Sequence, residues 1–84
     1  MSIQLEIPDT VAEALRLPAT DRPAQLRREL AVALYARGIL SFGKARELAV
    51  MDAYDFGRLL GERQIPRHYS EEELLEDATY ARGE

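Results

Sequence analysis

Few residues of this 84-residue chain could do chemistry, and most of them are acids and arginines. The chain has no cysteine, which excludes disulfides, thiolate nucleophiles and cysteine zinc sites. His68 is the single histidine, whereas most transition-metal sites use two or more imidazoles, so we interpret it as a loop residue. Because no nucleophile is paired with a base, the sequence predicts a protein that is not an enzyme and uses no metal or cofactor.

Acidic side chains gather near the C-terminus, in residues 71–77. Ser70 and Glu73 have the spacing of a capping box, which predicts the start of an acidic helix that runs to about Ala81. Two interpretations stay open: a solvated helix whose carboxylates match its dipole, or a helix that docks on a basic groove. Apolar side chains on the same segment favour docking on a partner or a second copy. They are Tyr69, Leu74, Leu75, Ala78 and Tyr80.

Basic and aromatic side chains in the middle of the chain are candidates for DNA contacts, with the cations on phosphates and the tyrosine on a base edge. These residues are Lys44, Arg46, Tyr54, Arg58 and Arg63. The alternative is that they are ordinary solvated side chains, since Asp52 and Asp55 would repel phosphate and the net charge is −4. Likewise, Arg22, Arg27 and Arg28 form either a basic face or a solvated side with arginine–glutamate pairs.

The first residues predict a β-strand. In Ser2–Ile7, Ile3, Leu5 and Ile7 alternate with polar residues, which is typical of a half-buried strand, and Pro8 ends it. A lone strand in a helical chain has no partner for its backbone groups, so we expect it to pair with another strand, such as its copy in a second subunit. The sequence therefore predicts a homodimer.

The remaining chain to residue 66 predicts short helices, so the fold class is mainly α. A long helix after Asp21, ended by Gly38, carries a spaced apolar stripe. The stripe is Leu26, Leu30, Ala33 and Leu34, and Val32, Tyr35 and Ala36 widen the apolar face. Within residues 39–66, two short helices capped by Ser41 and Asp52 and joined by a tight turn predict a helix-turn-helix. We divide the chain into a dimerisation and DNA-binding region at 1–66 and a partner-binding tail at 67–84.

The order of these motifs resembles an uncharacterised family of small bacterial and archaeal helix-turn-helix proteins. The motifs are the strand, the long helix, Ser41-x-Gly43-Lys44-Ala45, Phe56-x-x-x-Leu60, Ile65-Pro66 and Tyr69-Ser70 followed by acids, and they cover roughly residues 1–77. Members of that family look like antitoxins, often encoded beside PIN-domain ribonucleases. The resemblance implies an antitoxin of a type II toxin–antitoxin system that neutralises a PIN-type ribonuclease toxin by protein–protein binding and autoregulates its operon. A small helical transcriptional regulator or structural adaptor with no toxin remains the alternative.

The resemblance also directs attention to the tail as the element that binds the toxin. The residues expected to do so are Arg67, Tyr69, Leu74, Leu75, Ala78 and Arg82. Three positions depart from the family pattern, because Val50 and Gln64 replace usual glycines and Arg46 replaces a small residue. Since a β-branched residue rarely adopts positive φ, we expect Val50 to rebuild the turn or partly fuse the two helices, which would disturb DNA reading.

The expected location is the cytoplasm. No apolar run approaches the roughly 20 residues of a membrane helix. The residues after Met1 lack the basic start and apolar stretch of a signal peptide.

Overall fold

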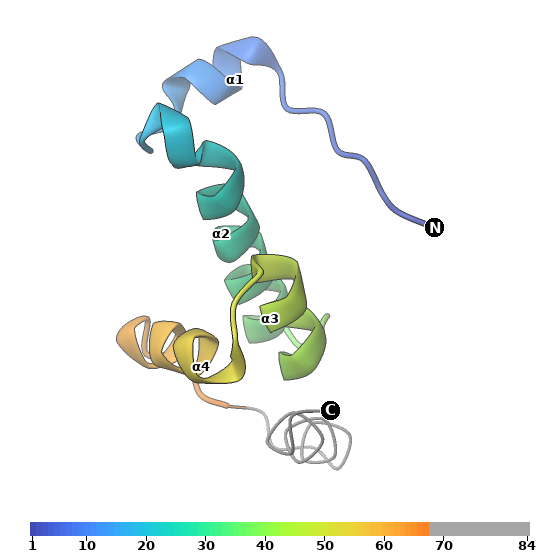
Figure 1. Ribbon diagram of the computed structural model, residues 1–84, viewed down its shortest axis with the longest axis vertical. Helices are drawn as coiled ribbons and strands as arrows, with labels where there is room; N and C mark the ends of the chain where they lie inside the picture. Colours follow the sequence, from blue (N-terminus) through green and yellow to red (C-terminus); the bar gives the residue numbers. More distant parts are fainter. Residues whose placement is uncertain (68–84) are drawn as a thin grey trace.

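The computed structural model describes residues 1–67, which form four α-helices and one 3₁₀-helix (Figure 1). The elements in chain order are α1 (Asp9–Ala14), the 3₁₀-helix η1 (Ala19–Asp21), α2 (Arg22–Ala36), α3 (Phe42–Ala49) and α4 (Ala53–Glu62). A small helical domain is therefore confirmed. The predicted C-terminal acidic helix and its capping box lie outside the described residues.

The predicted N-terminal strand is wrong, because residues 1–67 contain no strand. Residues 1–8 instead lead away from the helices, and Ile3 and Leu5 are 90% and 75% exposed (Figure 1). The physical reason is the absence of a ladder: a strand needs a neighbouring edge for its N–H and C=O groups, and the described part of the chain offers none. The alternation of apolar and polar residues in Ser2–Ile7 gives the segment two different faces, but a strand also needs a second strand to pair with.

The apolar face of α2 is also displaced from the predicted stripe. Ala31, Val32 and Tyr35 are the buried residues of this helix, whereas Leu30 is 42% exposed. The N-terminal half of α2 lies beside the end of α3, and Tyr35 contacts Phe42 at the start of α3, so the two helices run antiparallel. The position of α3 therefore determines which face of α2 is buried, and part of the leucine stripe stays exposed to solvent.

Three aromatic rings form the centre of the core. Tyr35, Phe42 and Phe56 come from α2, α3 and α4 and are at most 1% exposed. Ring centroids lie 6.0 Å apart for Tyr35–Phe42, 6.4 Å for Tyr35–Phe56 and 5.4 Å for Phe42–Phe56. The two pairs made by Tyr35 are edge-to-face, an arrangement that adds about 0.5–1.5 kcal/mol per pair beyond area burial, and the pair Phe42–Phe56 is tilted at 59°. The cluster therefore fixes all three helices at one point.

The ends of α2, α3 and α4 share one backbone motif. In each, a residue at or just after the C-cap is left-handed: Gly38 has φ +74°, Val50 φ +56° and Gln64 φ +57°. The next N–H then donates to a carbonyl five residues back, as from Met51 to Arg46 at 3.0 Å. This is the Schellman arrangement, which satisfies carbonyls that a helix end would leave unpaired. The stop at Gly38 is confirmed, and two non-glycine residues repeat it.

Candidate nucleic-acid and partner interface

Helices α3 and α4 are two short helices joined by a tight turn at residues 50–52. Ala45 and Ala49 are 0% and 3% exposed, so small side chains do lie where α3 packs into the core. Ser41 and Asp52 cap the two helices as predicted: the Lys44 N–H donates to Ser41 Oγ at 3.3 Å, and the Asp55 N–H donates to Asp52 Oδ1 at 2.7 Å. The sequence thus positions both helices through local caps.

The turn itself corrects the expectation for Val50. This residue is left-handed, with φ +56° and ψ +49°, and α3 and α4 stay separate helices. The turn is therefore neither rebuilt nor fused. Two backbone hydrogen bonds hold it, from Val50 to Glu47 at 3.1 Å and from Met51 to Arg46 at 3.0 Å, while the half-buried Met51 packs against the core. Val50 adopts a positive φ, which glycine would adopt without strain, because the two hydrogen bonds and the packing of Met51 fix the backbone there.

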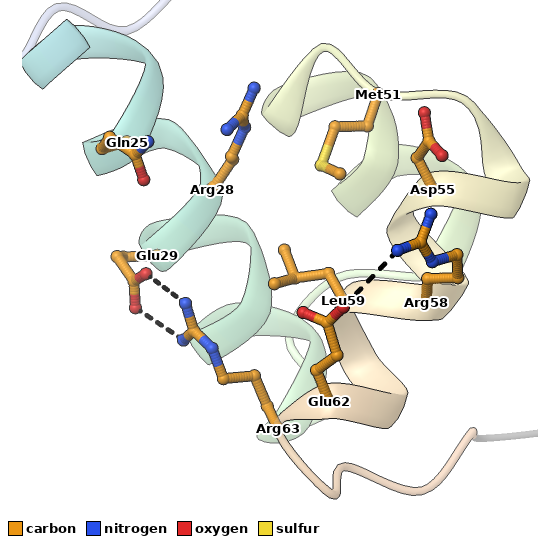
Figure 2. A pocket seen from close by; sticks show the side chains of 9 residues that line it. All are labelled: Gln25, Arg28, Glu29, Met51, Asp55, Arg58, Leu59, Glu62 and Arg63. Atoms are coloured by element: carbon orange, nitrogen blue, oxygen red, sulfur yellow. Dashed lines mark hydrogen bonds and ion pairs between the residues drawn. The ribbon is translucent and has the colours of Figure 1, made fainter.

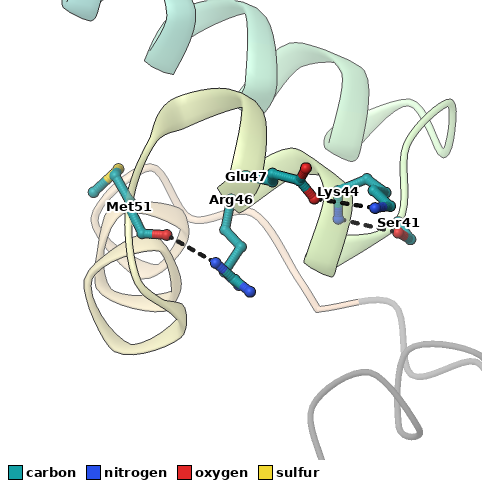
Figure 3. A network of polar contacts seen from close by, with 5 residues as sticks. All are labelled: Ser41, Lys44, Arg46, Glu47 and Met51. Atoms are coloured by element: carbon teal, nitrogen blue, oxygen red, sulfur yellow. Dashed lines mark hydrogen bonds and ion pairs between the residues drawn. The ribbon is translucent and has the colours of Figure 1, made fainter. Parts of the chain in front are cut away.

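Two of the predicted DNA contacts lie on α3 and are engaged within the protein (Figure 3). The Lys44 ammonium donates to Glu47 at 3.0 Å, one helical turn later, and both side chains are exposed. The Arg46 guanidinium donates to the Met51 carbonyl at 3.4 Å, across the turn. The Arg46 side chain therefore holds the two sides of the turn together.

The other candidates lie on α4 or just after it. Tyr54 is 73% exposed near the start of α4, and Arg58 is exposed and lies 3.8 Å from Glu62. Residues 41–63 hold four cations and four carboxylates, so this part of the surface has no net charge. The fold brings the predicted DNA residues onto neighbouring elements, but it intersperses carboxylates among them.

Arg63 differs from the others because its partner lies in a distant part of the chain. Its guanidinium donates two hydrogen bonds to the Glu29 carboxylate, at 2.9 and 2.6 Å, and so ties the end of α4 to α2 (Figure 2). These hydrogen bonds lower the pKa of the Glu29 carboxyl below its ordinary value; partial burial opposes this, and charge attraction adds to it. They form one wall of a cleft of about 230 Å³ that Met51 and Leu59 also line. Arg63, which was predicted to contact a DNA phosphate, thus joins the end of α4 to α2 instead.

Of the predicted partner-binding residues, only Arg67 lies in the described part. Its guanidinium carbon lies 3.7 Å from the centroid of the Phe42 ring, in a cation–π contact. This contact fixes the point at which the tail leaves the helical body. Tyr69, Leu74, Leu75, Ala78 and Arg82 lie outside the described residues, as does His68.

Sequence reasoning missed both long-range contacts, Glu29 with Arg63 and Phe42 with Arg67. The first joins residues 34 positions apart, so no local spacing could indicate it. Within residues 1–67, no helix is long and apolar enough to cross a bilayer. The same residues hold no group of three or more histidine or acidic side chains placed to bind a metal.

Comparison with known proteins places these features in a family. The pattern of the uncharacterised protein family UPF0175 matches residues 1–83. A UPF0175 protein of Aeropyrum pernix is 46% identical over 80 residues, covering 95% of this chain and 85% of the relative. Others, from Synechocystis and Archaeoglobus fulgidus, are 32% and 33% identical and cover 92% and 89% of this chain and 82% and 84% of their own. No solved structure matches the chain. The resemblance drawn from the motifs is thereby confirmed, and the chain belongs to the UPF0175 family.

Proposed function

We propose that this protein is the antitoxin of a type II toxin–antitoxin pair, and that it neutralises a PIN-type ribonuclease by binding it, without catalysis of its own. The observation that carries the proposal is the composition of the tail, in which five carboxylates flank two leucines within residues 71–77. The buried apolar side chains of the described region all lie between Ala31 and Leu60. Within residues 71–77, Leu74 and Leu75 offer apolar anchors to a partner.

The chemistry of the tail matches the chemistry of such an enzyme. A ribonuclease must hold anionic RNA, so its groove needs a basic rim around an acidic, metal-binding centre. The carboxylates of residues 71–77 suit that rim, while Leu74 and Leu75 supply apolar anchors. Arg82 would then pair with the acidic centre of the enzyme. The cation–π contact of Arg67 with Phe42 fixes the point from which the tail starts.

The test is co-expression with a PIN-type ribonuclease from the same genome, for which the neighbouring reading frame is the first place to search. Deleting residues 68–84, or introducing Leu74→Asp with Leu75→Asp, should restore toxicity and ribonuclease activity. A matched control introduces Val11→Asp with Ile39→Asp, which adds the same charge at two exposed apolar sites of the helical body. If cells carrying the truncated protein still grow and the purified pair still shows no ribonuclease activity, the proposal is wrong and the adaptor alternative gains.

Operator binding is the second candidate function, and the exposure of Tyr54 on α4 favours it. Two capped short helices joined by a tight turn are also the order of elements in DNA-binding helix-turn-helix proteins. Arg58→Ala should weaken a gel shift with upstream DNA, and affinity should fall as salt rises. Absence of any complex, with or without the toxin, would remove this function.

A dimer is the assembly that the exposed apolar residues favour. Ile3, Leu5 and Ile7 are exposed at the N-terminus, and Leu30 is 42% exposed on α2. We propose that the first residues of one copy cover the leucine stripe of a second, with each buried side chain contributing roughly 1.5–3 kcal/mol. Leu5→Asp should then yield monomer in light scattering. A wild-type protein that is monomeric at micromolar concentration would exclude the dimer.

A further inference from the structure

A shallow groove lies between the first turns of α2 and the end of α3, and it shares Arg28 with the cleft described above. Its volume is about 400 Å³. Two arginines and small or branched apolar side chains line it, and no carboxylate does. The lining residues, which we call the arginine groove, are Pro23, Ala24, Arg27, Arg28, Ala49 and Val50.

Arg27 and Arg28 differ from the cations on the neighbouring helices. Neither forms an ion pair or a side-chain hydrogen bond with any residue of the described part of the chain. The Nε atom of Arg28 is out of contact with solvent and has no hydrogen-bond partner there. By contrast, Lys44, Arg58 and Arg63 each face a glutamate. The arginine groove is thus a site where positive charge is left uncompensated beside apolar surface.

We propose that the arginine groove is the docking site for this chain's own acidic segment, residues 71–77, when no other partner holds that segment. The segment carries five carboxylates, and Leu74 and Leu75 lie among them. Its carboxylates complement Arg27 and Arg28, and its leucines complement the apolar lining of the groove. This goes beyond the proposed function, because it concerns the free protein and holds whether or not the natural partner is a ribonuclease.

The length of the chain permits this contact. Arg67 lies over Phe42 in the first turn of α3, and the groove reaches Ala49 in its last turn. Seven residues of helix span about 10 Å at 1.5 Å per residue. The four steps from residue 67 to residue 71 span up to about 13 Å when extended. Attachment also gives the segment an effective concentration in the millimolar range, which suits contacts that are individually weak.

The test measures paramagnetic broadening in the full-length protein without a partner. Because the chain has no cysteine, Ala78→Cys accepts a single nitroxide label. The label should at least halve the amide signals of Ala24, Ala49 and Val50. The broadening should persist when labelled protein is diluted with an excess of unlabelled protein, because the contact is intramolecular. It should disappear in about 1 M salt, where the Debye length is about 3 Å.

A charge reversal tests the arginines directly. Arg27→Glu with Arg28→Glu should abolish the broadening, whereas Arg16→Glu with Arg37→Glu, the same charge change at two exposed arginines elsewhere, should leave it intact.

The proposal is wrong if the label does not broaden the groove signals of the wild type. It is also wrong if the broadening persists after Arg27→Glu with Arg28→Glu, or in about 1 M salt. If the label leaves the groove unaffected while added duplex DNA shifts its amides, the groove binds nucleic acid and the proposal is likewise wrong. The wild-type and salt measurements decide the question even if the reversed variant does not fold. None of these experiments includes a toxin, so their failure leaves the antitoxin proposal to its own test.

Discussion

Replacing Val50 with glycine should stabilise the protein. The left-handed conformation costs an L-residue roughly 1–2 kcal/mol, and Val50 holds it at φ +56°. Glycine escapes that cost but adds about 0.5–1 kcal/mol of unfolded-state entropy. The side chain is 72% exposed, so its removal forfeits little burial. The midpoints of the two ranges predict a rise of about 0.75 kcal/mol in the free energy of unfolding, or about 3–6 °C in Tm for a chain of this size.

Urea unfolding, monitored by far-ultraviolet circular dichroism, measures this gain in the free energy of unfolding. Two further glycine variants serve as comparisons. Gln64→Gly relieves the same conformation at the end of α4, where the replaced residue is not β-branched, so its gain should be smaller. Val11→Gly makes the same substitution at a half-exposed site inside α1 and should destabilise. If Val50→Gly lowers the free energy of unfolding as Val11→Gly does, the argument from strain is refuted.

The same variant bears on DNA binding. Because the turn already has the geometry that glycine would adopt, Val50→Gly should leave any operator affinity unchanged in a gel shift. A large gain in affinity would mean that the valine side chain itself obstructs the contact.

Two further predictions concern the long-range contacts. Glu29→Gln should lower the free energy of unfolding at neutral pH by about 0.5–1 kcal/mol, because the pair with Arg63 is bidentate but nearly half exposed. Because the folded pKa of Glu29 lies below its ordinary value of 4.5, the pair's contribution is present above that value and disappears as pH falls through the lowered one. Urea unfolding at neutral pH and at a pH below the lowered pKa of Glu29 checks this, with Glu13→Gln as the control. If wild type and Glu29→Gln differ in free energy of unfolding as much at the low pH as at neutral pH, the prediction is wrong. Arg67→Met should cost about 1 kcal/mol through the lost contact with Phe42, measured by thermal unfolding, and full stability in the variant would show that the contact contributes nothing.

Local signals in the sequence predicted the local structure correctly. Ser41 and Asp52 cap the helices to which they were assigned, because a cap depends on a side chain and a backbone N–H three residues away. Gly38 ends α2 for an equally local reason. Features that depend on a second element were predicted poorly. The N-terminal alternation needed a strand partner, and the buried face of α2 depended on where α3 packs.

The candidate site follows the same division. The sequence placed Lys44, Tyr54 and Arg58 on the two short helices, and the structure has them there. It could not reveal that Arg63 clamps Glu29, because the two residues are 34 positions apart and nothing in their neighbourhoods marks the pairing. At Val50 the prediction was wrong for another reason. The preference of β-branched residues against positive φ predicted a rebuilt turn, but the backbone hydrogen bonds of the turn outweigh that preference.

The charge arrangement on α3 and α4 constrains how this protein could hold DNA. The pairs Lys44–Glu47 and Arg58–Glu62 are exposed, so opening either costs at most about 1 kcal/mol, and a phosphate could displace the glutamate. The Arg63–Glu29 pair is bidentate and joins two helices, so moving Arg63 to a phosphate would also loosen the fold. Operator affinity should therefore depend on Lys44 and Arg58 more than on Arg63. Because at most a few phosphates would be neutralised, the dependence of the affinity on salt should have a small slope, near −0.9 per phosphate contact.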